Sequence, residues 1–268
     1  MEMKESLYLD LLKRCLTNSI YGNAEQENIS NKGLKKFFVE TLFPQGVSLV
    51  RAKPFNPEKR KKGLDWPVTA HTMIGLERLD NLQYCMEQVL LNEVPGDFIE
   101  TGVWRGGSTI FMRAILKAYG VNNRYVWVAD SFQGLPPPDV DQYPQDVGDV
   151  HHTIAELKIS LDQVKANFES YGLLDEQVKF LKGWFKDTLP SAPIDTLAVV
   201  RLDGDMYEST MDALKVLYPK LSIGGYLIVD DYCISSCAKA VHDYRDQYGI
   251  RDEIIQIDGT GVFWKRLS

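Results

Sequence analysis

The sequence predicts a doubly wound α/β fold, with a mostly parallel sheet covered by helices on both faces. From residue 96 onward, short apolar runs alternate with helical stretches, which is typical of β-α-β units in a buried parallel sheet. The 268 residues suffice for one such domain with an added N-terminal segment. The last two apolar runs, at 253–259 and 261–267, are joined by a tight turn, so we expect the final strand to be antiparallel to its neighbour.

The N-terminal quarter of the chain has a different pattern. Helices are expected over 5–17 and 31–43, and a long helix is expected over 72–91. Residues 51–67 are rich in Lys, Arg, Pro and Gly and are expected to form a loop. This loop is either a solvated connector or a mobile lid over a site. We therefore divide the chain into an N-terminal helical or lid segment, 1–66, and a sheet domain, 67–268.

The elements of the sheet domain follow in order. Strands are expected at 97–103, 125–132, 178–185, 197–205 and 225–232, with helices near 108–120, 157–172, 209–221 and 237–249. A terminal hairpin after five parallel strands suits the methyltransferase version of the doubly wound sheet. Nicotinamide-binding domains usually end with another parallel strand instead.

Composition and charge restrict the class of partner. The net charge of -7 argues against nucleic acid, since phosphate binding favours a basic face. No apolar run approaches the roughly 20 residues that span a membrane, and the N-terminus lacks the features of a signal peptide. Cys233 and Cys237 are four residues apart, so a metal pair is conceivable, but reduced thiols in a cytoplasmic protein are the simpler interpretation. We expect a cytoplasmic protein without a nucleic-acid or membrane partner.

A glycine-rich loop follows the first strand of the sheet domain. In open α/β sheets, ligands bind beyond the carboxyl ends of the strands. ETGVWRGGST, 100–109, carries Gly102, Gly106 and Gly107 before a helix that Ser108 or the next residue opens. The spacing differs from that of the dinucleotide fingerprint. Glu100 would repel a pyrophosphate but suits a cationic ligand that carries an ammonium and a sulfonium.

The next two strand ends complete a candidate cofactor site. Asp130 could accept hydrogen bonds from both ribose hydroxyls, although a strand-end aspartate often serves only in a turn or a cap. Gly183, Trp184 and Phe185 could flank a purine. Together, and in this order, these residues predict an S-adenosylmethionine site.

Paired carboxylates follow the fourth and fifth strands, in RLDGDMY and GGYLIVDDY. Asp203, Asp230 and Asp231 should converge at adjacent strand ends, where a Mg²⁺ ion would relieve their repulsion. Helix capping is the alternative, because both segments precede helices. We expect Asp203 to be a metal ligand and the general base, and Asp205 to cap the following helix.

The chemistry that fits this site is methyl transfer to a hydroxyl. A metal lowers the pKa of a bound hydroxyl, and a neighbouring carboxylate can take its proton. His151 and His152 lie in the polar loop 139–152, which could be a lid or a substrate wall, and they are rival bases. His71 is expected to be structural, and His242 is a further rival.

Long motifs make the sequence resemble a known family. HTMIGLERLDNL, PGDFIETGVWRGGSTIFMRAIL, VWVADSFQGLP and RLDGDMYESTMDALKVLYPKLSIGGYLIVDDY together look like the macrocin O-methyltransferase family, over residues 67 to the C-terminus. The resemblance implies a class I methyltransferase fold, S-adenosylmethionine, Mg²⁺ and a homo-oligomer. It implies metal ligation by Asp203, Asp230 and Asp231. The candidate cofactor-binding residues are Thr72, Met73, Glu100, Thr101, Gly102, Gly106, Ser108, Asp130, Ser131, Gly183, Trp184 and Phe185.

Several alternatives remain open on sequence alone. The acceptor could be a sugar, phenol or polyketide hydroxyl of a small natural product. The enzyme could be metal-independent or methylate nitrogen, and a non-catalytic S-adenosylmethionine-binding partner in a biosynthetic complex is a further possibility. An NAD-dependent enzyme is disfavoured by the glycine spacing and by Glu100.

Overall fold

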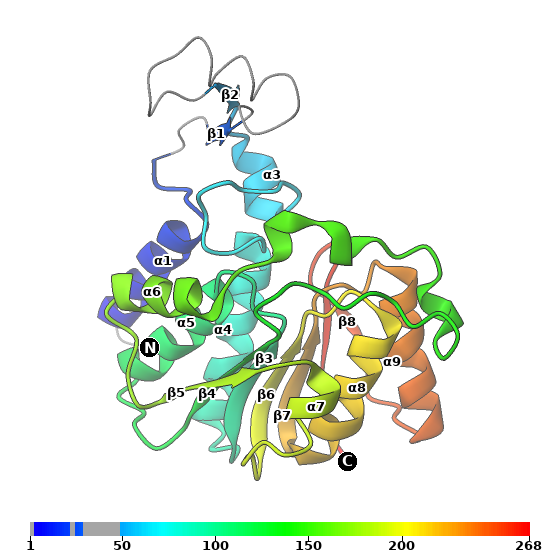
Figure 1. The fold of residues 1–268 in the computed structure, drawn as a ribbon. Coiled ribbons are helices and arrows are strands. Elements are labelled where there is room, and N and C mark those ends of the chain that lie inside the picture. The colour runs from blue at the N-terminus through cyan, green and yellow to red at the C-terminus, as the bar shows by residue number, and fades with distance from the viewer. Residues whose placement is uncertain (1–2, 22–24, 29–48) are drawn as a thin grey trace.

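The computed structural model describes residues 3–21, 25–28 and 49–268, so the helix expected over 31–43 lies outside the described residues. A seven-stranded sheet forms the centre of the molecule, in the order β5-β4-β3-β6-β7-β9-β8 (Figure 1). Its strands are β3 Asp97–Thr101, β4 Val126–Asp130, β5 Val178–Lys182, β6 Leu197–Leu202, β7 Leu221–Val229, β8 Ile255–Gln256 and β9 Val262–Lys265.

The direction of the strands confirms the expected topology. Strands β3 to β7 pair in parallel, and β9 is antiparallel to both β7 and β8. The carboxyl ends of the five parallel strands therefore meet along one edge of the sheet. That edge is where a ligand site is expected in an open α/β fold.

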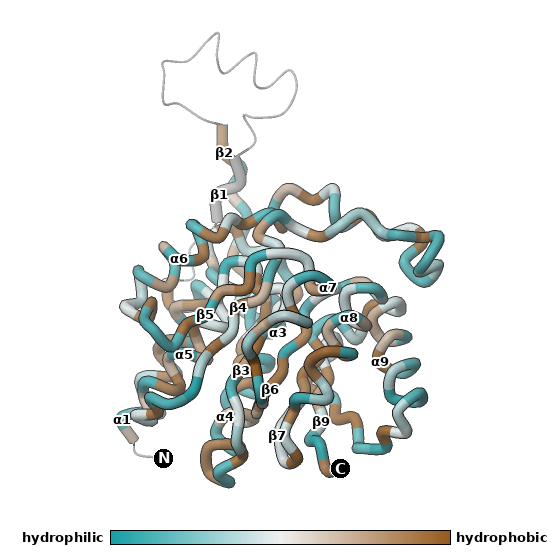
Figure 2. The backbone as a smooth tube through the Cα atoms, turned by 60° about the horizontal axis from the view of Figure 1, so that its bottom comes forward, coloured by the Kyte–Doolittle hydropathy of each residue, from teal (hydrophilic) through white to brown (hydrophobic). Residues whose placement is uncertain are grey.

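Helices cover both faces of the sheet. The longer helices are α1 Met3–Leu16, α4 Leu76–Leu91, α5 Gly107–Ala118, α6 Leu161–Ser170, α8 Tyr207–Leu217 and α9 Ser235–Gln247. Successive strand residues point to opposite faces. Phe98 packs in the cluster with α1, α4, α5 and α6, whereas Ile99 packs in the cluster with α8 and α9. Figure 2 shows the resulting apolar centre in brown.

Helix α1 joins the core through one apolar face. Leu9, Leu12 and Leu16 are buried in the cluster that contains α4 and α5. The helix expected over 5–17 is thus confirmed, and it packs directly on the body formed by residues 67–268. The backbone of Leu16 also accepts a hydrogen bond from His71 N at 2.9 Å.

The prediction of a loop over residues 51–67 is wrong in part. Strand β2 Val50–Lys53 pairs with β1 Glu25–Asn28, and helix α3 Pro57–Lys62 follows. Asn56 caps this helix by accepting a hydrogen bond from Lys59 N at 3.0 Å, and the left-handed Gly63 ends it. Proline at the first position and glycine after the last are helix signals, so the sequence carried this information.

None of the helices in the described parts of the chain is long and apolar enough to cross a membrane. The four cysteines are free thiols, of which Cys85 and Cys237 are buried.

Candidate active site

A cavity of about 440 Å³ opens at the carboxyl ends of the parallel strands. Nine of the residues predicted from the sequence line it: Met73, Gly102, Asp130, Ser131, Trp184, Phe185, Asp203, Asp230 and Asp231. The remaining six lie outside its lining: Thr72, Glu100, Thr101, Gly106, Ser108 and Gly183. The structure thus brings together residues that are up to about 160 positions apart in the sequence, since α/β topology aligns the strand ends.

The glycine-rich loop is shaped by a close backbone crossing. Gly102 has φ +83°, and a Cβ there would lie 1.6 Å from the carbonyl oxygen of Asp203. The amide of Asp203 in turn donates to Thr101 O at 2.9 Å. Glycine is required at this position because any side chain would push β3 away from the strand end that carries Asp203.

Asp130 fixes the same loop from the neighbouring strand. Its two carboxylate oxygens accept hydrogen bonds from the amides of Val103, at 2.8 Å, and Phe132, at 2.7 Å. Burial raises the pKa of this carboxyl, and those backbone amides oppose the rise. A carboxylate has about four acceptor positions. Ser131 Oγ also donates to Asp130 Oδ1, at 3.4 Å, so protein donors already occupy at least three of these positions.

Trp184 and Phe185 extend the cavity wall after β5. Both side chains are half-buried and line the cavity, and Phe185 begins the short helix α7 Phe185–Thr188. Gly183, just before them, has φ +146° and donates its amide to Asp130 O at 2.9 Å. This hydrogen bond joins the segment that carries both aromatic residues to the end of β4, and their contact with a purine stays a prediction.

Glu100 lies beneath the cavity rather than on its wall. Its carboxylate is 1% exposed and accepts a hydrogen bond from Arg201 Nη1. Burial raises the pKa of Glu100 to about 8, and the charge of Arg201 opposes the rise. The expectation that Glu100 faces a cationic ligand is not supported by this position, because Arg201 already provides its cationic partner.

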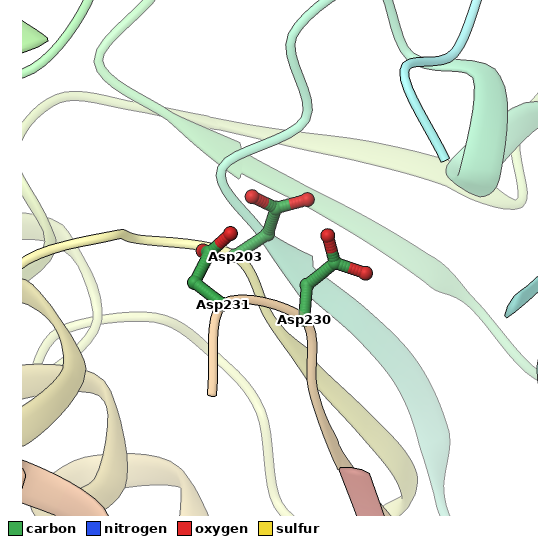
Figure 3. Close-up of side chains that lie close together, drawn as sticks. All are labelled: Asp203, Asp230 and Asp231. Atoms are coloured by element: carbon green, nitrogen blue, oxygen red, sulfur yellow. The ribbon is translucent and has the colours of Figure 1, made fainter. Parts of the chain in front are cut away.

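Three carboxylates converge at the ends of β6 and β7 (Figure 3). One oxygen from each of Asp203, Asp230 and Asp231 lies within 4.8 Å of the others. Burial and the charge of Asp230 raise the pKa of Asp203 to about 6. Burial and the charge of Asp205 raise the pKa of Asp231 well above its usual value. The convergence predicted from the sequence is therefore present, and it is electrostatically costly.

Arg201 is a central member of this site that sequence reasoning missed. It lies inside the buried strand β6 and donates to Glu100, to Asp203 Oδ2 at 2.8 Å, and to Asp230 Oδ1. An arginine in the otherwise apolar run LAVVRL was the available signal, because a fully buried arginine needs anionic partners. Arg201 holds two of the three converging carboxylates in place.

The capping role expected for Asp205 is wrong. Helix α8 begins at Tyr207, and the residue that precedes it, Met206, makes no side-chain cap. The carboxylate of Asp146 caps the helix instead, accepting from the amides of Tyr207 at 2.7 Å and Glu208 at 3.0 Å. Asp205 has φ +55° and lines the cavity. A cap from 61 residues away leaves no local sequence signal.

One histidine of the 139–152 loop reaches the cavity. His151 lines it, and its Nδ1 lies 2.6 Å from Asp149 Oδ2. Burial lowers the pKa of His151, but the hydrogen bond with Asp149 and the negative charges of Asp205 and Asp149 together raise it overall. His152 is not in the lining, and His71 has the structural contact expected of it, with Tyr171 Oη 2.7 Å from its Nδ1.

The converging carboxylates fit a hard divalent cation. Their donors are all oxygens, which Mg²⁺ prefers. Burial, followed by the charges of neighbouring carboxylates, raises the pKa values of Asp203 and Asp231. Arg78 and Arg201 each pair with Asp230. Each oxygen of Asp230 has one guanidinium partner and keeps a lone pair. Asp203, Asp230 and Asp231 could therefore hold such an ion.

This sheet order and this arrangement of strand-end residues define the class I methyltransferases. The model of the macrocin-O-methyltransferase (TylF) family matches residues 5–266, and the chain belongs to this family. The match includes the N-terminal segment, which the motifs from residue 67 onward had not covered.

Individual relatives agree with the family. The chain is 55% identical over its whole length to the 8-demethyl-8-(2,3-dimethoxy-alpha-L-rhamnosyl)-tetracenomycin-C 4'-O-methyltransferase of Streptomyces olivaceus, covering 95% of it. It is 52% identical to the mycinamicin III 3''-O-methyltransferase of Micromonospora griseorubida, covering 97% of this chain and 96% of that protein. The solved structure of the O-methyltransferase NovP matches with TM-score 0.86 at 49% identity, over 98% of this chain and all of that one. The protein is therefore an O-methyltransferase of natural-product biosynthesis.

Proposed function

We propose that this enzyme transfers the methyl group of S-adenosylmethionine to a hydroxyl of a small, sugar-bearing natural product, with Mg²⁺ bound at the converging carboxylates. The proposal rests on one observation: Asp130 and the three converging carboxylates, Asp203, Asp230 and Asp231, line the same cavity. Two relatives support the acceptor class, since one is named for a rhamnosyl-tetracenomycin and the other for mycinamicin III. A phenol or polyketide hydroxyl is the second acceptor class.

The cofactor would lie between the first three strand ends. Asp130 lines this part of the cavity and is the carboxylate that we assign to the ribose, and Trp184 and Phe185 offer apolar surface for a purine. Gly102 lines the same part of the cavity and keeps the end of β3 close to Asp203. Glu100 would act on this site indirectly, through Arg201, rather than by contact.

The chemistry requires the acceptor hydroxyl to lose its proton as its oxygen attacks. The oxygen forms a bond to the methyl carbon while the carbon–sulfur bond breaks, and the electron pair of that bond remains on sulfur. We propose that Asp203 accepts this proton. Arg201 donates a hydrogen bond to Asp203 Oδ2, and the Oδ1 atom has no hydrogen bond from Arg201. A Mg²⁺ ion bound at the site would lower the pKa of the hydroxyl and orient it. His151, held by Asp149, lines the same cavity and is the second candidate base.

The proposal is tested by incubating the enzyme with S-adenosylmethionine, Mg²⁺ and a panel of glycosylated and phenolic acceptors. Mass spectrometry should detect the gain of one methyl group on a sugar-bearing acceptor. Titration calorimetry should show binding of S-adenosylmethionine and no binding of NAD. Absence of S-adenosylmethionine binding would refute the assignment of the cofactor.

A further inference from the structure

Arg78 joins three separate segments at one side of the cavity. This α4 side chain is 8% exposed, and its Nη1 donates to Asp230 Oδ2. Its Nη2 donates to Gly63 O at 3.4 Å, and its Nε lies 3.0 Å from Asp258 Oδ2. One guanidinium therefore contacts the end of α3, the end of β7 and the turn between β8 and β9.

The three segments build one wall of the cavity. Residues 63–66, Asp230, Asp231, Cys233 and Thr260 all line it, together with Arg78 itself. The turn is also tied to the end of β7, because Cys233 N donates to Thr260 O at 3.0 Å. Arg78 is thus shared between the N-terminal segment, which lies over the cavity, and the carboxylates below it.

The N-terminal segment contacts α4 at van der Waals distance. A Cβ on Gly75 would lie 2.1 Å from Lys61 O, and a Cβ on Gly63 would lie 2.5 Å from Arg78 Nη2. Backbone therefore packs directly on backbone, with Arg78 against it. A displacement of residues 57–66 would remove the Gly63 contact of the Arg78 guanidinium, which also donates to Asp230.

Asp230 connects Arg78 to the three converging carboxylates. Arg201 occupies one of its oxygens and Arg78 occupies the other, so two guanidiniums fix the plane of the carboxylate. Groups that orient a ligating carboxylate affect metal binding strongly, even without touching the metal.

We propose that Arg78 is a positioning residue that couples the placement of residues 57–66 over the cavity to cation binding at Asp203, Asp230 and Asp231. This inference rests on the proposed metal site. Because coupling of this kind is reciprocal, a bound cation should hold the segment in place, and a well-placed segment should strengthen cation binding.

The chain offers a matched control for a buried arginine. Arg113 on α5 is 5% exposed and pairs with Asp175 through Nη2, at 2.6 Å, and Nε, at 2.9 Å. Neither residue lines the cavity. Arg113→Lys should disturb packing as Arg78→Lys does, while leaving the carboxylate cluster untouched. Both substitutions keep the positive charge. They therefore test the geometry of the planar guanidinium, with its several N–H donors, rather than net charge.

The experiment compares the full-length wild type, Arg78→Lys and Arg113→Lys without acceptor or methyl donor. Mn²⁺ binding is followed by electron paramagnetic resonance, and tryptic cleavage within α3, at Lys59, Lys61 or Lys62, is followed by fragment mass. Wild type should bind Mn²⁺, and saturating Mn²⁺ should slow this cleavage by roughly fivefold or more. Arg78→Lys should raise the Mn²⁺ Kd by about 10–100-fold and abolish the protection. Arg113→Lys should retain both properties.

A second variant covers the case in which Arg78→Lys fails to fold. Gly63→Ala places a methyl group 2.5 Å from Arg78 Nη2 and 2.6 Å from Gly75 N, so it displaces the segment from α4. It alters no charge and no carboxylate, and it should also weaken Mn²⁺ binding. If wild type binds no Mn²⁺, the proposed metal site is wrong and the coupling falls with it. If wild type binds Mn²⁺ but the ion does not change the rate of tryptic cleavage, the coupling alone is refuted. The coupling alone is also refuted if Gly63→Ala and a folded Arg78→Lys bind Mn²⁺ as tightly as wild type does.

Discussion

At the scale of single residues, the site places several carboxylates where repulsion between them is strong. Arg201 offsets part of this charge by pairing with Glu100, Asp203 and Asp230 from inside a strand. Burial and the charges of neighbouring carboxylates still raise the pKa values of Asp203 and Asp231. The sequence predicted the acidic residues, because they follow apolar runs, but the arginines that orient them were recognisable only once their partners were placed.

Asp203→Asn tests the role of the residue assigned as base. Because asparagine cannot take the proton, kcat should fall by about 10²-fold or more. The Kd for S-adenosylmethionine, measured by calorimetry, should stay close to that of wild type. Asp97→Asn is the control, since Asp97 accepts from Tyr125 N at 2.9 Å at the opposite end of the sheet. A kcat for Asp203→Asn within about tenfold of wild type, roughly 1.4 kcal/mol in the barrier, would remove Asp203 from this role.

At the scale of elements, the order of strands and helices in residues 97–265 could be predicted because each strand is an apolar run between helical stretches. Helix α3 was missed because the density of Lys and Arg in PEKRKK masked its terminal signals. The cap of α8 could not be predicted locally, since Asp146 comes from a loop that becomes its neighbour only in the folded chain. Long-range contacts of this kind determine the conformation of the loops around the cavity.

Asp146→Ala tests whether the 139–152 loop is tethered to α8. Asp146 is 1% exposed and supplies both hydrogen bonds of the cap, so its loss should reduce the free energy of unfolding by about 2 kcal/mol. Urea denaturation measures this change. Because the loop carries His151 into the cavity, the KM for the acceptor should also rise.

The control for this prediction is another helix cap. Ser160 caps α6 by accepting from Gln163 N at 3.2 Å, away from the cavity lining. Ser160→Ala should cost about 1 kcal/mol and leave the KM for the acceptor unchanged. Equal effects of the two substitutions on stability and on KM would show that the Asp146 tether has no role at the site.

At the scale of the whole molecule, the sheet places the carboxylates and several residues predicted to bind the cofactor along one edge. The N-terminal segment adds residues 63–66 to the same cavity. The sequence could predict the sheet and its edge because α/β topology fixes where strand ends meet. Trp66, Arg78 and Thr260 also line the cavity, and Thr260 lies more than 180 residues from the other two. Their meeting follows from tertiary packing and has no signature in the local sequence.

Removal of the metal tests most directly whether the carboxylate cluster works through a bound cation. The enzyme is treated with a chelator, freed of it by dialysis, and assayed with S-adenosylmethionine and an acceptor by mass gain. Since the cation would lower the pKa of the attacking hydroxyl, turnover should fall by about 10²-fold or more and return when Mg²⁺ is added. Undiminished turnover by an enzyme shown to contain no metal would contradict metal-assisted methyl transfer at Asp203, Asp230 and Asp231.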